Sequence, residues 1–394
     1  MRKFSMLLTL LLIVAVALPV ATLVPVAAAQ ETAPDCTQPD VVCVGLVTDV
    51  GKVDDKSFNQ SAWEGLQKAK ADGDADWIQY IETTDSKDYD KNIATFADAG
   101  YDVIVTSGFN LTDPTYAAAK KYPNIVFLGT DQFLSKDDNH PDWPLPNLVG
   151  LVYNEDQSGF LVGALGAMLS KSHKLGAVAG TDAVPPVWRY GEGYKAGAAY
   201  VDAKRGTKTE VTVVYHSDVG FDKTFTDPTW GADTANSMMD KGADVIFGIG
   251  GKTGNGGVIA AAQRGLYGVG VDVDQYLTLP EAQKQLITSA LKPITAPVAD
   301  LIKQAKAGQI EGGLFFGTAG YAPYHDQASL VPADVDAEMQ AILKGLTDGT
   351  IKTNVPPVKP AEQAGGLGTT TLLIIIVVVV VVLVAVFLFR RRKK

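Results

Sequence analysis

Short apolar runs rich in valine and isoleucine alternate with helix-like stretches along most of the chain. A strand buried on both faces reads as such a continuous apolar run, and a helix between two strands lets them lie parallel. The alternation therefore predicts an α/β fold in which helices cover both faces of parallel sheets. The runs occupy residues 41–49, 77–82, 101–108, 124–131, 147–154, 174–180, 209–216, 243–250 and 267–274.

The number of runs predicts two lobes. Nine strands are too many for one small sheet of this kind, and the roughly 320 residues of the body exceed the size at which a single core stops growing. We expect the break near the Pro-rich stretch "PDWPLPN", residues 141–147. In open parallel sheets, ligands bind beyond the carboxyl ends of the strands. The residues that end each run are therefore the candidate site.

The ends of the runs carry carboxylates, glycines and an aromatic side chain. They read Thr48-Asp49, Ser107-Gly108-Phe109, Thr130-Asp131, Gly250-Gly251 and Asp272-Val273-Asp274. Carboxylates accept hydrogen bonds from hydroxyl and amino groups, and glycine lets a ligand approach the backbone closely. The pattern predicts a site for a small ligand that donates hydrogen bonds.

The stretch "TDVGKVDDKSFNQSAWEGL", residues 48–66, adds an aromatic ring and an amide. A helix is predicted from Ser57, and Asp55 has the place of a helix cap, because acidic side chains there bind free amides and complement the helix dipole. Phe58 lies in the first turn, where it either packs in the core or stacks on a planar ligand. Asn59 beside it is a further binding candidate.

The glycine-rich stretch "FGIGGKTGNGG", residues 247–257, does not have the spacing of a nucleotide-phosphate loop. A P-loop requires glycine where Ile246 stands, and the dinucleotide fingerprint requires glycine where Thr253 stands. What remains is a turn that opens a helix, in which the backbone of Gly250 can contact the ligand.

The stretch "PPVWRYGEGYKAG", residues 185–197, supplies two aromatic candidates. Trp188 and Tyr190 are two positions apart near a predicted helix start, so they face different directions. At most one of them is expected to meet the ligand, and the other to pack.

Neither catalysis nor a metal site is predicted. The four histidines are scattered without metal-ligand spacing, and no Gly-x-Ser-x-Gly elbow occurs. We expect no cofactor. Between the two apolar ends, 27 Lys and Arg residues face 44 Asp and Glu residues, a net charge of −17. This balance argues against nucleic acid and anionic lipid as partners, because both require basic patches.

The two ends of the chain predict export and a membrane anchor. Residues 1–30 have the basic start, apolar stretch and small-residue end of a signal peptide. Residues 371–389 include 18 uninterrupted apolar residues, which as a helix span roughly 27 Å, enough for a bilayer core. The basic residues 390–394 place the tail in the cytoplasm and the body outside the cell membrane. A flexible tether is expected over residues 351–370.

Cys36 and Cys43 are the only cysteines. In an extracytoplasmic protein they could close a small loop as a disulfide. The alternative is a pair of ordinary free thiols, since other soft metal ligands are lacking nearby.

The motifs "GLVTDVGKVDDKSFNQSAWEGL", "GTDQ", "RYGEGYKAG", "GGKTGNGGVIAAAQ", "GVGVDVDQ" and "LITSALK" resemble, in order and spacing, those of the basic membrane protein family of solute-binding proteins. The resemblance covers about residues 41–320. It implies a type I periplasmic-binding-protein fold with two Rossmann-like lobes and a three-crossing hinge. The N-terminal lobe would hold residues 41–150 and about 290–315, and the C-terminal lobe residues 151–289 and about 316–350.

The best-understood members of this family are PnrA-like purine nucleoside receptors. The resemblance therefore implies an extracytoplasmic component of an ABC importer, which closes around a purine nucleoside and delivers it to a permease. It implies base contacts from Asp49, Asn59 and Asp131, stacking by Phe58, and ribose contacts from Asp272 and Lys292.

Two features depart from the family pattern. A lipidated cysteine usually tethers members, but Cys36 lacks that sequence setting, and the C-terminal segment takes its place. Lys292 is followed by Pro293, where the family usually has a basic residue. The same cleft would also suit a membrane-anchored sensor or surface receptor, a binder of another small ligand such as a sugar, or a glycoside-cleaving enzyme.

Overall fold

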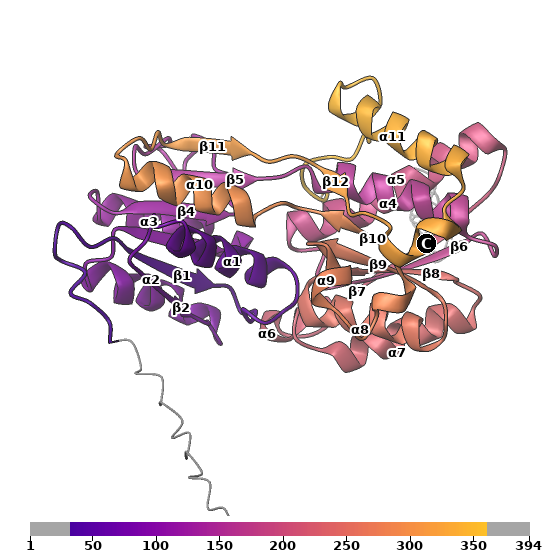
Figure 1. Cartoon of the computed structure of the whole chain (residues 1–394), viewed down its shortest axis with the longest axis horizontal. Coiled ribbons are helices and arrows are strands. Elements are labelled where there is room, and N and C mark those ends of the chain that lie inside the picture. The colour runs from indigo at the N-terminus through magenta and orange to yellow at the C-terminus, as the bar shows by residue number, and fades with distance from the viewer. Residues whose placement is uncertain (1–31, 361–394) are drawn as a thin grey trace, which may run out of the picture. The chain divides into compact units, whose positions relative to one another are not determined.

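A computed structural model describes residues 32–360 of the chain. The predicted signal peptide, the anchor, the basic tail and the second half of the tether lie outside these residues. From Asp35 onward the described residues belong to one compact unit with two six-stranded sheets (Figure 1). Within residues 32–360, no helix has both the length and the apolar character that a membrane crossing requires.

The first lobe is built on an all-parallel sheet with the strand order β11-β5-β4-β3-β1-β2. Figure 1 shows the orange segments α10 and β11 among the indigo and purple elements of this lobe, so the chain returns to it late. The elements are β1 (Cys43–Thr48), α1 (Phe58–Ala71), β2 (Trp77–Ile81), α2 (Tyr89–Asp98), β3 (Val103–Ser107), α3 (Thr112–Lys121), β4 (Val126–Thr130), β5 (Leu148–Val152), α10 (Thr295–Lys306) and β11 (Gly313–Phe316).

The second lobe has the strand order β12-β10-β9-β8-β6-β7, in which only β12 is antiparallel to its neighbour. Its elements are α4 (Glu155–Leu169), β6 (Lys174–Ala179), α5 (Pro185–Arg205), β7 (Glu210–Tyr215), α6 (Phe221–Thr224), α7 (Pro228–Asp240), β8 (Val245–Ile249), α8 (Gly251–Gln263), β9 (Tyr267–Asp272), α9 (Gln275–Thr278), β10 (Leu286–Leu291), β12 (Gly320–Tyr321) and α11 (Ala333–Thr347).

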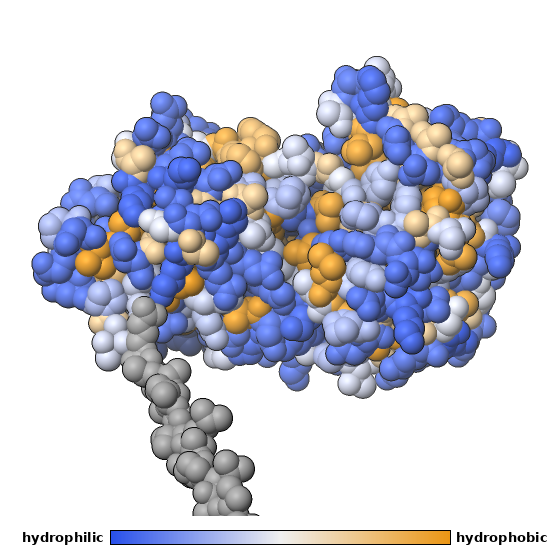
Figure 2. Space-filling view, viewed as in Figure 1, coloured by the Kyte–Doolittle hydropathy of each residue, from blue (hydrophilic) through white to orange (hydrophobic). Residues whose placement is uncertain are grey.

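Strand β1 shows why both faces of a sheet are covered. All six of its residues are buried, and alternate side chains point to opposite faces. Val44 and Leu46 pack in a cluster with residues of α1 and α10, whereas Val47 packs in another cluster with residues of α2 and α3. Figure 2 shows hydrophobic residues only as small groups on a mainly hydrophilic face, because the apolar runs are inside.

The nine predicted strands are confirmed as β1 to β9, and so is the two-lobe α/β architecture with mainly parallel sheets. The alternation did not predict β10, β11 or β12. The break expected at residues 141–147 is wrong, because this loop joins β4 to β5 within one sheet. The chain leaves the first sheet only after β5.

Three segments connect the two sheets. Residues 153–154 lead from β5 to α4, residues 292–294 lead from β10 to α10, and residues 317–319 lead from β11 to β12. Both lobes therefore contain segments that are far apart in the sequence.

A disulfide ties the start of the body to the first strand. Cys36 and Cys43 are bonded, with their Cα atoms 5.7 Å apart. Both are buried, and Cys43 is the first residue of β1. The described residues contain no free cysteine.

Glycines bring α4 and α5 into backbone contact in the second lobe. A Cβ atom added to Gly163 of α4 would lie 2.1 Å from the carbonyl oxygen of Tyr194, and one added to Gly197 of α5 would lie 1.9 Å from that of Phe160. No flexible side chain can move away to make room, because the obstacles are backbone atoms. This helix pair therefore depends on the absence of side chains at these positions.

We predict that Gly197→Ala lowers the free energy of unfolding by about 2 kcal/mol, because the methyl group pushes α5 away from α4. Gly166→Ala in α4 is the matched control, since its Cβ would lie 3.3 Å from the nearest atom, a terminal carbon of Leu175. That variant should be neutral or slightly more stable, because alanine favours a helix over glycine by about 1 kcal/mol. Urea unfolding followed by tryptophan fluorescence measures both, and equal stabilities would contradict the prediction.

Candidate functional site

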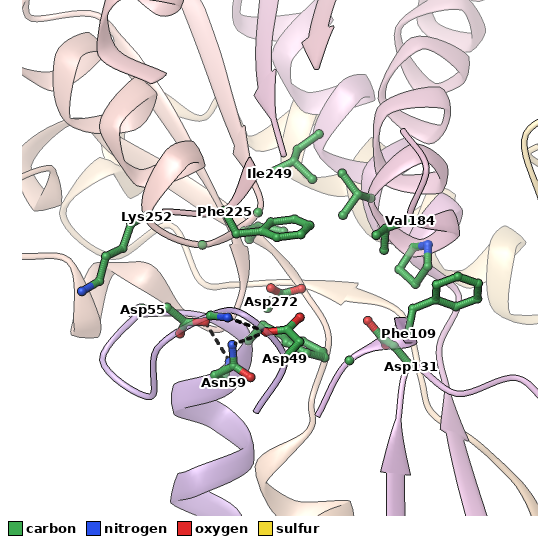
Figure 3. A pocket seen from close by; sticks show the side chains of 18 of the residues that line it. Asp49, Asp55, Asn59, Phe109, Asp131, Val184, Phe225, Ile249, Lys252 and Asp272 are labelled. Carbon is green, nitrogen blue, oxygen red and sulfur yellow. Dashed lines mark hydrogen bonds between the residues drawn. The ribbon is translucent and has the colours of Figure 1, made fainter. Parts of the chain in front are cut away.

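A pocket of about 690 Å³, including its open mouth, lies between the carboxyl ends of the two sheets. This is the edge at which open parallel sheets bind ligands. Figure 3 shows its side chains converging from both lobes. The first lobe supplies Asp49, Gly51, Lys52, Asp55, Phe58, Asn59, Gly108, Phe109, Asn110 and Asp131, and the rest of the chain supplies Val184, Pro186, Val187, Tyr190, Phe221, Phe225, Thr226, Ile249, Gly250, Gly251, Lys252, Val271, Asp272 and Lys292.

Asp49 and Asn59 form one polar corner of the pocket. Asp49 Oδ1 accepts hydrogen bonds from the backbone N–H of Gly51 at 2.9 Å and from Asn59 Nδ2 at 3.2 Å, and Figure 3 shows the two side chains pointing toward each other. Burial raises the pKa of Asp49 to about 6, although these two hydrogen bonds favour the ionised form. Asn59 Oδ1 is buried and has no hydrogen-bond partner among the described residues.

Asp55 caps helix α1 from within the pocket wall. Its carboxylate accepts from the backbone N–H groups of Ser57 and Asn59, both at 2.9 Å, and of Gln60 at 3.1 Å. This bears out the predicted capping role. Burial raises the pKa of Asp55 to about 7.

Lys292 lies at the centre of a buried charge network that joins the two lobes. Its Nζ is 2.7 Å from Asp131 Oδ2 and 3.3 Å from Glu155 Oε1, and Glu155 Oε2 is 2.9 Å from Arg189 Nη1 of α5. Burial by itself would lower the pKa of Lys292, but Asp131, Glu155 and Asp272 together raise it. The ammonium group therefore keeps its charge.

Asp131 is the first residue beyond β4. Burial raises its pKa, although the neighbouring Lys292 opposes the rise. Asp131 Oδ1 is buried without a hydrogen-bond partner among residues 32–360. This atom and Asn59 Oδ1 are two acceptors that the described protein does not satisfy, and unsatisfied buried acceptors are costly. A ligand that donates hydrogen bonds would relieve that cost.

Aromatic rings surround the ammonium group of Lys292. Its Nζ lies 5.2 Å from the ring centroid of Phe58, 5.5 Å from that of Tyr190 and 5.9 Å from that of Tyr153. These distances are within the range of cation–π attraction. Phe58 and Tyr190 line the pocket.

Asp272, the last residue of β9, receives hydrogen bonds from both lobes. Its Oδ2 accepts from Ser57 Oγ at 2.7 Å, and its Oδ1 accepts from Tyr190 Oη at 3.1 Å. Its backbone is left-handed, with φ 65°, and that of Asp131 is similar, with φ 60°. Aspartate tolerates this conformation better than most residues. A carboxylate in an unusual backbone conformation thus stands at the carboxyl end of β4 and of β9.

Two glycines at the pocket have backbones that other residues rarely adopt. Gly108 has φ 129°, and a Cβ atom there would lie 2.8 Å from Asp49 Oδ2. Gly250 has φ 102°, with the Phe225 ring 3.0 Å from such an atom. Side chains at these positions would collide with the pocket lining.

The opposite wall of the pocket is apolar. Figure 3 shows Val184, Phe225 and Ile249 across the pocket from Asp49 and Asn59, with Phe109 beside Asp131. Phe221 belongs to the same lining. Sequence reasoning missed Phe221 and Phe225 because they lie in and just after the short helix α6. Their place between β7 and the next helix was the available signal, since loops at this edge face the ligand site.

The structure brings together most of the residues predicted from the sequence. Trp188 is the exception: it is buried, with 6% of its surface exposed, but it does not line the pocket. Successive residues of a helix are about 100° apart, so Tyr190 at two positions further on faces elsewhere. The residues placed at the pocket are Asp49, Phe58, Asn59, Gly108, Asp131, Tyr190, Gly250, Asp272 and Lys292.

The chemistry of the site is that of recognition through hydrogen-bond acceptors. Four aspartates line the pocket, against the lysines Lys52, Lys252 and Lys292. Each of these cations is paired with a carboxylate, at 2.9, 2.7 and 2.7 Å respectively. Within the described part of the chain, no three His, Cys, Asp or Glu residues are grouped to hold a metal ion.

Comparison with known proteins gives consistent results. The family described as "ABC transporter substrate-binding protein PnrA-like" matches residues 42–316. A "CD4+ T-cell-stimulating antigen" of Listeria monocytogenes is 32% identical over 80% of this chain and 88% of its own length. An "ABC transporter nucleoside-binding protein BmpA" of Lactococcus lactis is 29% identical over 68% of this chain and 76% of its own length. A crystal structure of an ABC transporter solute-binding protein from Aeropyrum pernix has a TM-score of 0.69 and 24% identity, over 79% of this chain and 92% of that one.

We predict that Asp49→Asn stabilises the ligand-free protein in a pH-dependent manner. Burial raises the pKa of Asp49 from 3.8 to about 6. The contribution of this group to the stability of the wild type is therefore fully present below pH 3.8 and is lost as the pH rises through 6. Asparagine resembles the protonated acid. The variant should therefore gain up to about 3 kcal/mol above pH 7 and much less near pH 4.5.

Urea unfolding of both proteins between pH 4.5 and 7.5 measures this difference. Asp233→Asn on the exposed surface of α7 is the control, and it should match the wild type at every pH. A gain for Asp49→Asn that is the same at all pH values would contradict the prediction.

Proposed function

Because the chain belongs to the PnrA-like family of ABC transporter substrate-binding proteins, which matches residues 42–316, we propose that it captures a purine nucleoside between its two lobes. The ligand is then delivered to an ABC transporter permease. The protein works as a binding component without a cofactor and leaves the nucleoside intact.

The observation that carries this proposal is the pair of unsatisfied acceptors beside an aromatic ring. Asn59 Oδ1 and Asp131 Oδ1 are buried without partners among the described residues, and Phe58 lines the same pocket. The N–H groups of a purine base supply donors, and its flat ring stacks on a phenyl group. We assign the base to Asp49, Phe58, Asn59 and Asp131.

The sugar is assigned to Asp272 and Lys292. Each carboxylate oxygen of Asp272 accepts one hydrogen bond from the protein and can accept another from a hydroxyl group. The ammonium group of Lys292 has three N–H donors, of which Asp131 and Glu155 take two. The third is available to a ribose oxygen.

The charges of the pocket favour a nucleoside over a nucleotide. The cations at the pocket already have carboxylate partners, and Asp49, Asp55 and Asp272 are not paired with them. A phosphate group would meet carboxylates without a free cation to neutralise it. Neutral ligands that donate hydrogen bonds avoid this repulsion.

Binding occurs by closure of the lobes about the three connecting segments. The closed form is favoured because the ligand contacts both lobes at once. We assign residues 41–152 and 295–316 to one moving lobe, and residues 155–291 and about 320–350 to the other, because these ranges follow the membership of the two sheets.

We also propose that the protein is exported and anchored by its C-terminal segment. Residues 1–30 would act as the signal peptide and residues 371–389 as a single membrane span, with the body outside. The last described residues are held to the second lobe, because Thr353 Oγ1 donates to Asp156 and Lys359 pairs with Asp182 at 2.7 Å. The tether would therefore begin from that lobe.

We predict that the body, residues 31–360, binds inosine without added metal, and that Phe58→Ala weakens inosine and hypoxanthine alike. Loss of base stacking should cost on the order of 1 to 3 kcal/mol, about 5- to 150-fold in affinity. Phe133→Ala is the matched control, because Phe133 is 60% exposed and does not line the pocket. Isothermal titration calorimetry tests this.

In the same titrations, Asp272→Ala should weaken inosine more than hypoxanthine, since only inosine carries the ribose. Equal losses for both ligands would show that Asp272 does not contact the sugar. Tighter binding of a free sugar, or a need for a divalent cation, would overturn the proposed ligand. Chromatography of inosine after prolonged incubation should show no free base.

We predict that a chain truncated after Gly365 is released into the medium, whereas the full-length chain stays with the membrane fraction. The truncation removes the predicted span and the basic tail, so only the tether remains. Immunoblots of both fractions measure this, with a chain lacking only residues 390–394 as the control. Retention of the truncated chain in the membrane would refute the C-terminal anchor.

A further inference from the structure

A loop of the first lobe is held by the second lobe at a place next to the pocket. The loop, residues 51–57, belongs to the connection between β1 and α1, and Figure 3 shows the part that carries Asp55 next to Lys252 of α8. Lys252 Nζ lies 2.7 Å from Asp54 Oδ1 at the rim. Behind this ion pair, one contact is buried and two are partly buried.

Three side chains of the second lobe bind backbone carbonyl groups of the loop. Asn255 Nδ2 donates to the carbonyl oxygen of Asp55 at 2.8 Å. Gln275 Nε2 and Thr278 Oγ1 donate to that of Lys56 at 3.0 and 2.9 Å. These contacts recognise the path of the backbone rather than the side chains of the loop.

The loop is shaped for these contacts by its own structure. Lys56 has a left-handed backbone with φ 61°, a conformation that costs energy for lysine. The Asp55 carboxylate stabilises the path, since it accepts from the backbone N–H groups of Ser57, Asn59 and Gln60. The loop therefore presents two successive carbonyl groups in a fixed arrangement.

The receiving side chains are fixed as well. Gln275 Nε2 also donates to Asn255 Oδ1 at 2.8 Å, and Gln275 Oε1 accepts from the backbone N–H of Val271 at 3.1 Å. Gln275 is fully buried, and 6% of Asn255 is exposed. Both N–H groups of the Gln275 amide are thus used, one within the second lobe and one on the loop.

We propose that Asn255, Gln275 and Thr278 form a latch that holds the lobes closed by binding the backbone of residues 55–56. None of the three lines the pocket, so they are positioning residues and not ligand contacts. The latch rests on the proposed function only in requiring that lobe closure accompanies binding.

A latch outside the pocket affects all ligands equally. The apparent dissociation constant equals the intrinsic constant divided by the fraction of molecules that can close. Weakening the latch lowers this fraction whatever the ligand is. Every ligand should therefore lose the same factor in affinity, whereas changes of pocket residues alter the preference between ligands.

The test uses Asn255→Asp in the full ligand-binding body. The new carboxylate can still accept from Gln275 Nε2, but it cannot donate to the Asp55 carbonyl and repels it, so closure is penalised while the second lobe keeps its internal hydrogen bond. Asn236→Asp on α7, a partly exposed position in the same lobe, is the matched control. Thr278→Val is a milder second variant that removes one donor to Lys56.

Closure is measured without ligand by energy transfer between dyes at Lys91→Cys on α2 and Ser237→Cys on α7, both exposed positions. The native cysteines are disulfide-bonded and do not react with the dyes. We expect Asn255→Asp to shift the lobes toward the open form, to weaken inosine and hypoxanthine by the same factor of about 10, and to leave their ratio unchanged. Thr278→Val should weaken the binding of both ligands by about 3-fold.

The latch would be overturned if Asn255→Asp showed the same energy transfer and the same affinities as Asn236→Asp. A loss of affinity for one ligand only would overturn it as well. If Asn255→Asp does not fold, by circular dichroism, Thr278→Val decides on the same criteria. The failure of the proposed ligand is distinguishable: the wild type would then bind neither inosine nor hypoxanthine, while the energy transfer between the dyes would still report closure.

Discussion

The buried ammonium group of Lys292 joins parts of the structure that are otherwise separate. Lys292 follows β10 at one connection between the sheets, Asp131 follows β4 of the first lobe, and Glu155 begins α4 after another connection. A buried charge is tolerated only where opposite charges compensate it, and removing one partner leaves the others uncompensated. The position of each of these groups is therefore tied to the positions of the other two. The network extends to Arg189 of α5, so it also fixes the helix that carries Tyr190.

The acidity of the pocket comes at a cost in stability. Burial raises the pKa of Asp49 to about 6 and that of Asp55 to about 7, so ionising either carboxyl group costs more free energy in the folded protein than in water. Asp55 recovers part of this cost through three backbone hydrogen bonds. Asn59 Oδ1 and Asp131 Oδ1 are buried and find no hydrogen-bond partner among the described residues to offset the cost of their own burial. A site that retains unsatisfied acceptors is suited to a ligand that brings donors.

Much of the fold was predictable because burial leaves a local mark on the sequence. Seven of the nine runs that became β1 to β9 are buried along almost their whole length, and strands buried on both faces are apolar over consecutive residues. The edge strands β2 and β7 are partly exposed. Strand β11, with four residues, and β12, with two, are too short for such a pattern. Their places depend on pairing with β5 and β10, which are distant in the sequence.

The candidate site was predictable where it coincides with strand ends. Asp49, Gly108 and Asp131 follow three parallel strands of one sheet, so their convergence follows from the topology alone. Phe221 and Phe225 do not end a strand, so only their place in the connection after β7 pointed to the site. The choice between Trp188 and Tyr190 depended on the rotation of α5 about its axis, which its glycine contacts with α4 fix.

The sequence by itself determined the alternation of strands and helices, the division into two lobes, the acidic and aromatic character of the strand ends and the helix cap at Asp55. All of these follow from periodicity, chain length and the preferences of single residues. Only the tertiary structure decided which groups meet across the lobes. Lys292 pairs with Asp131 from 161 positions away, and Ser57 donates to Asp272 from 215 positions away. Such pairings depend on how the two separate sheets are oriented about their connections, and the residues near either partner in the chain carry no record of that orientation.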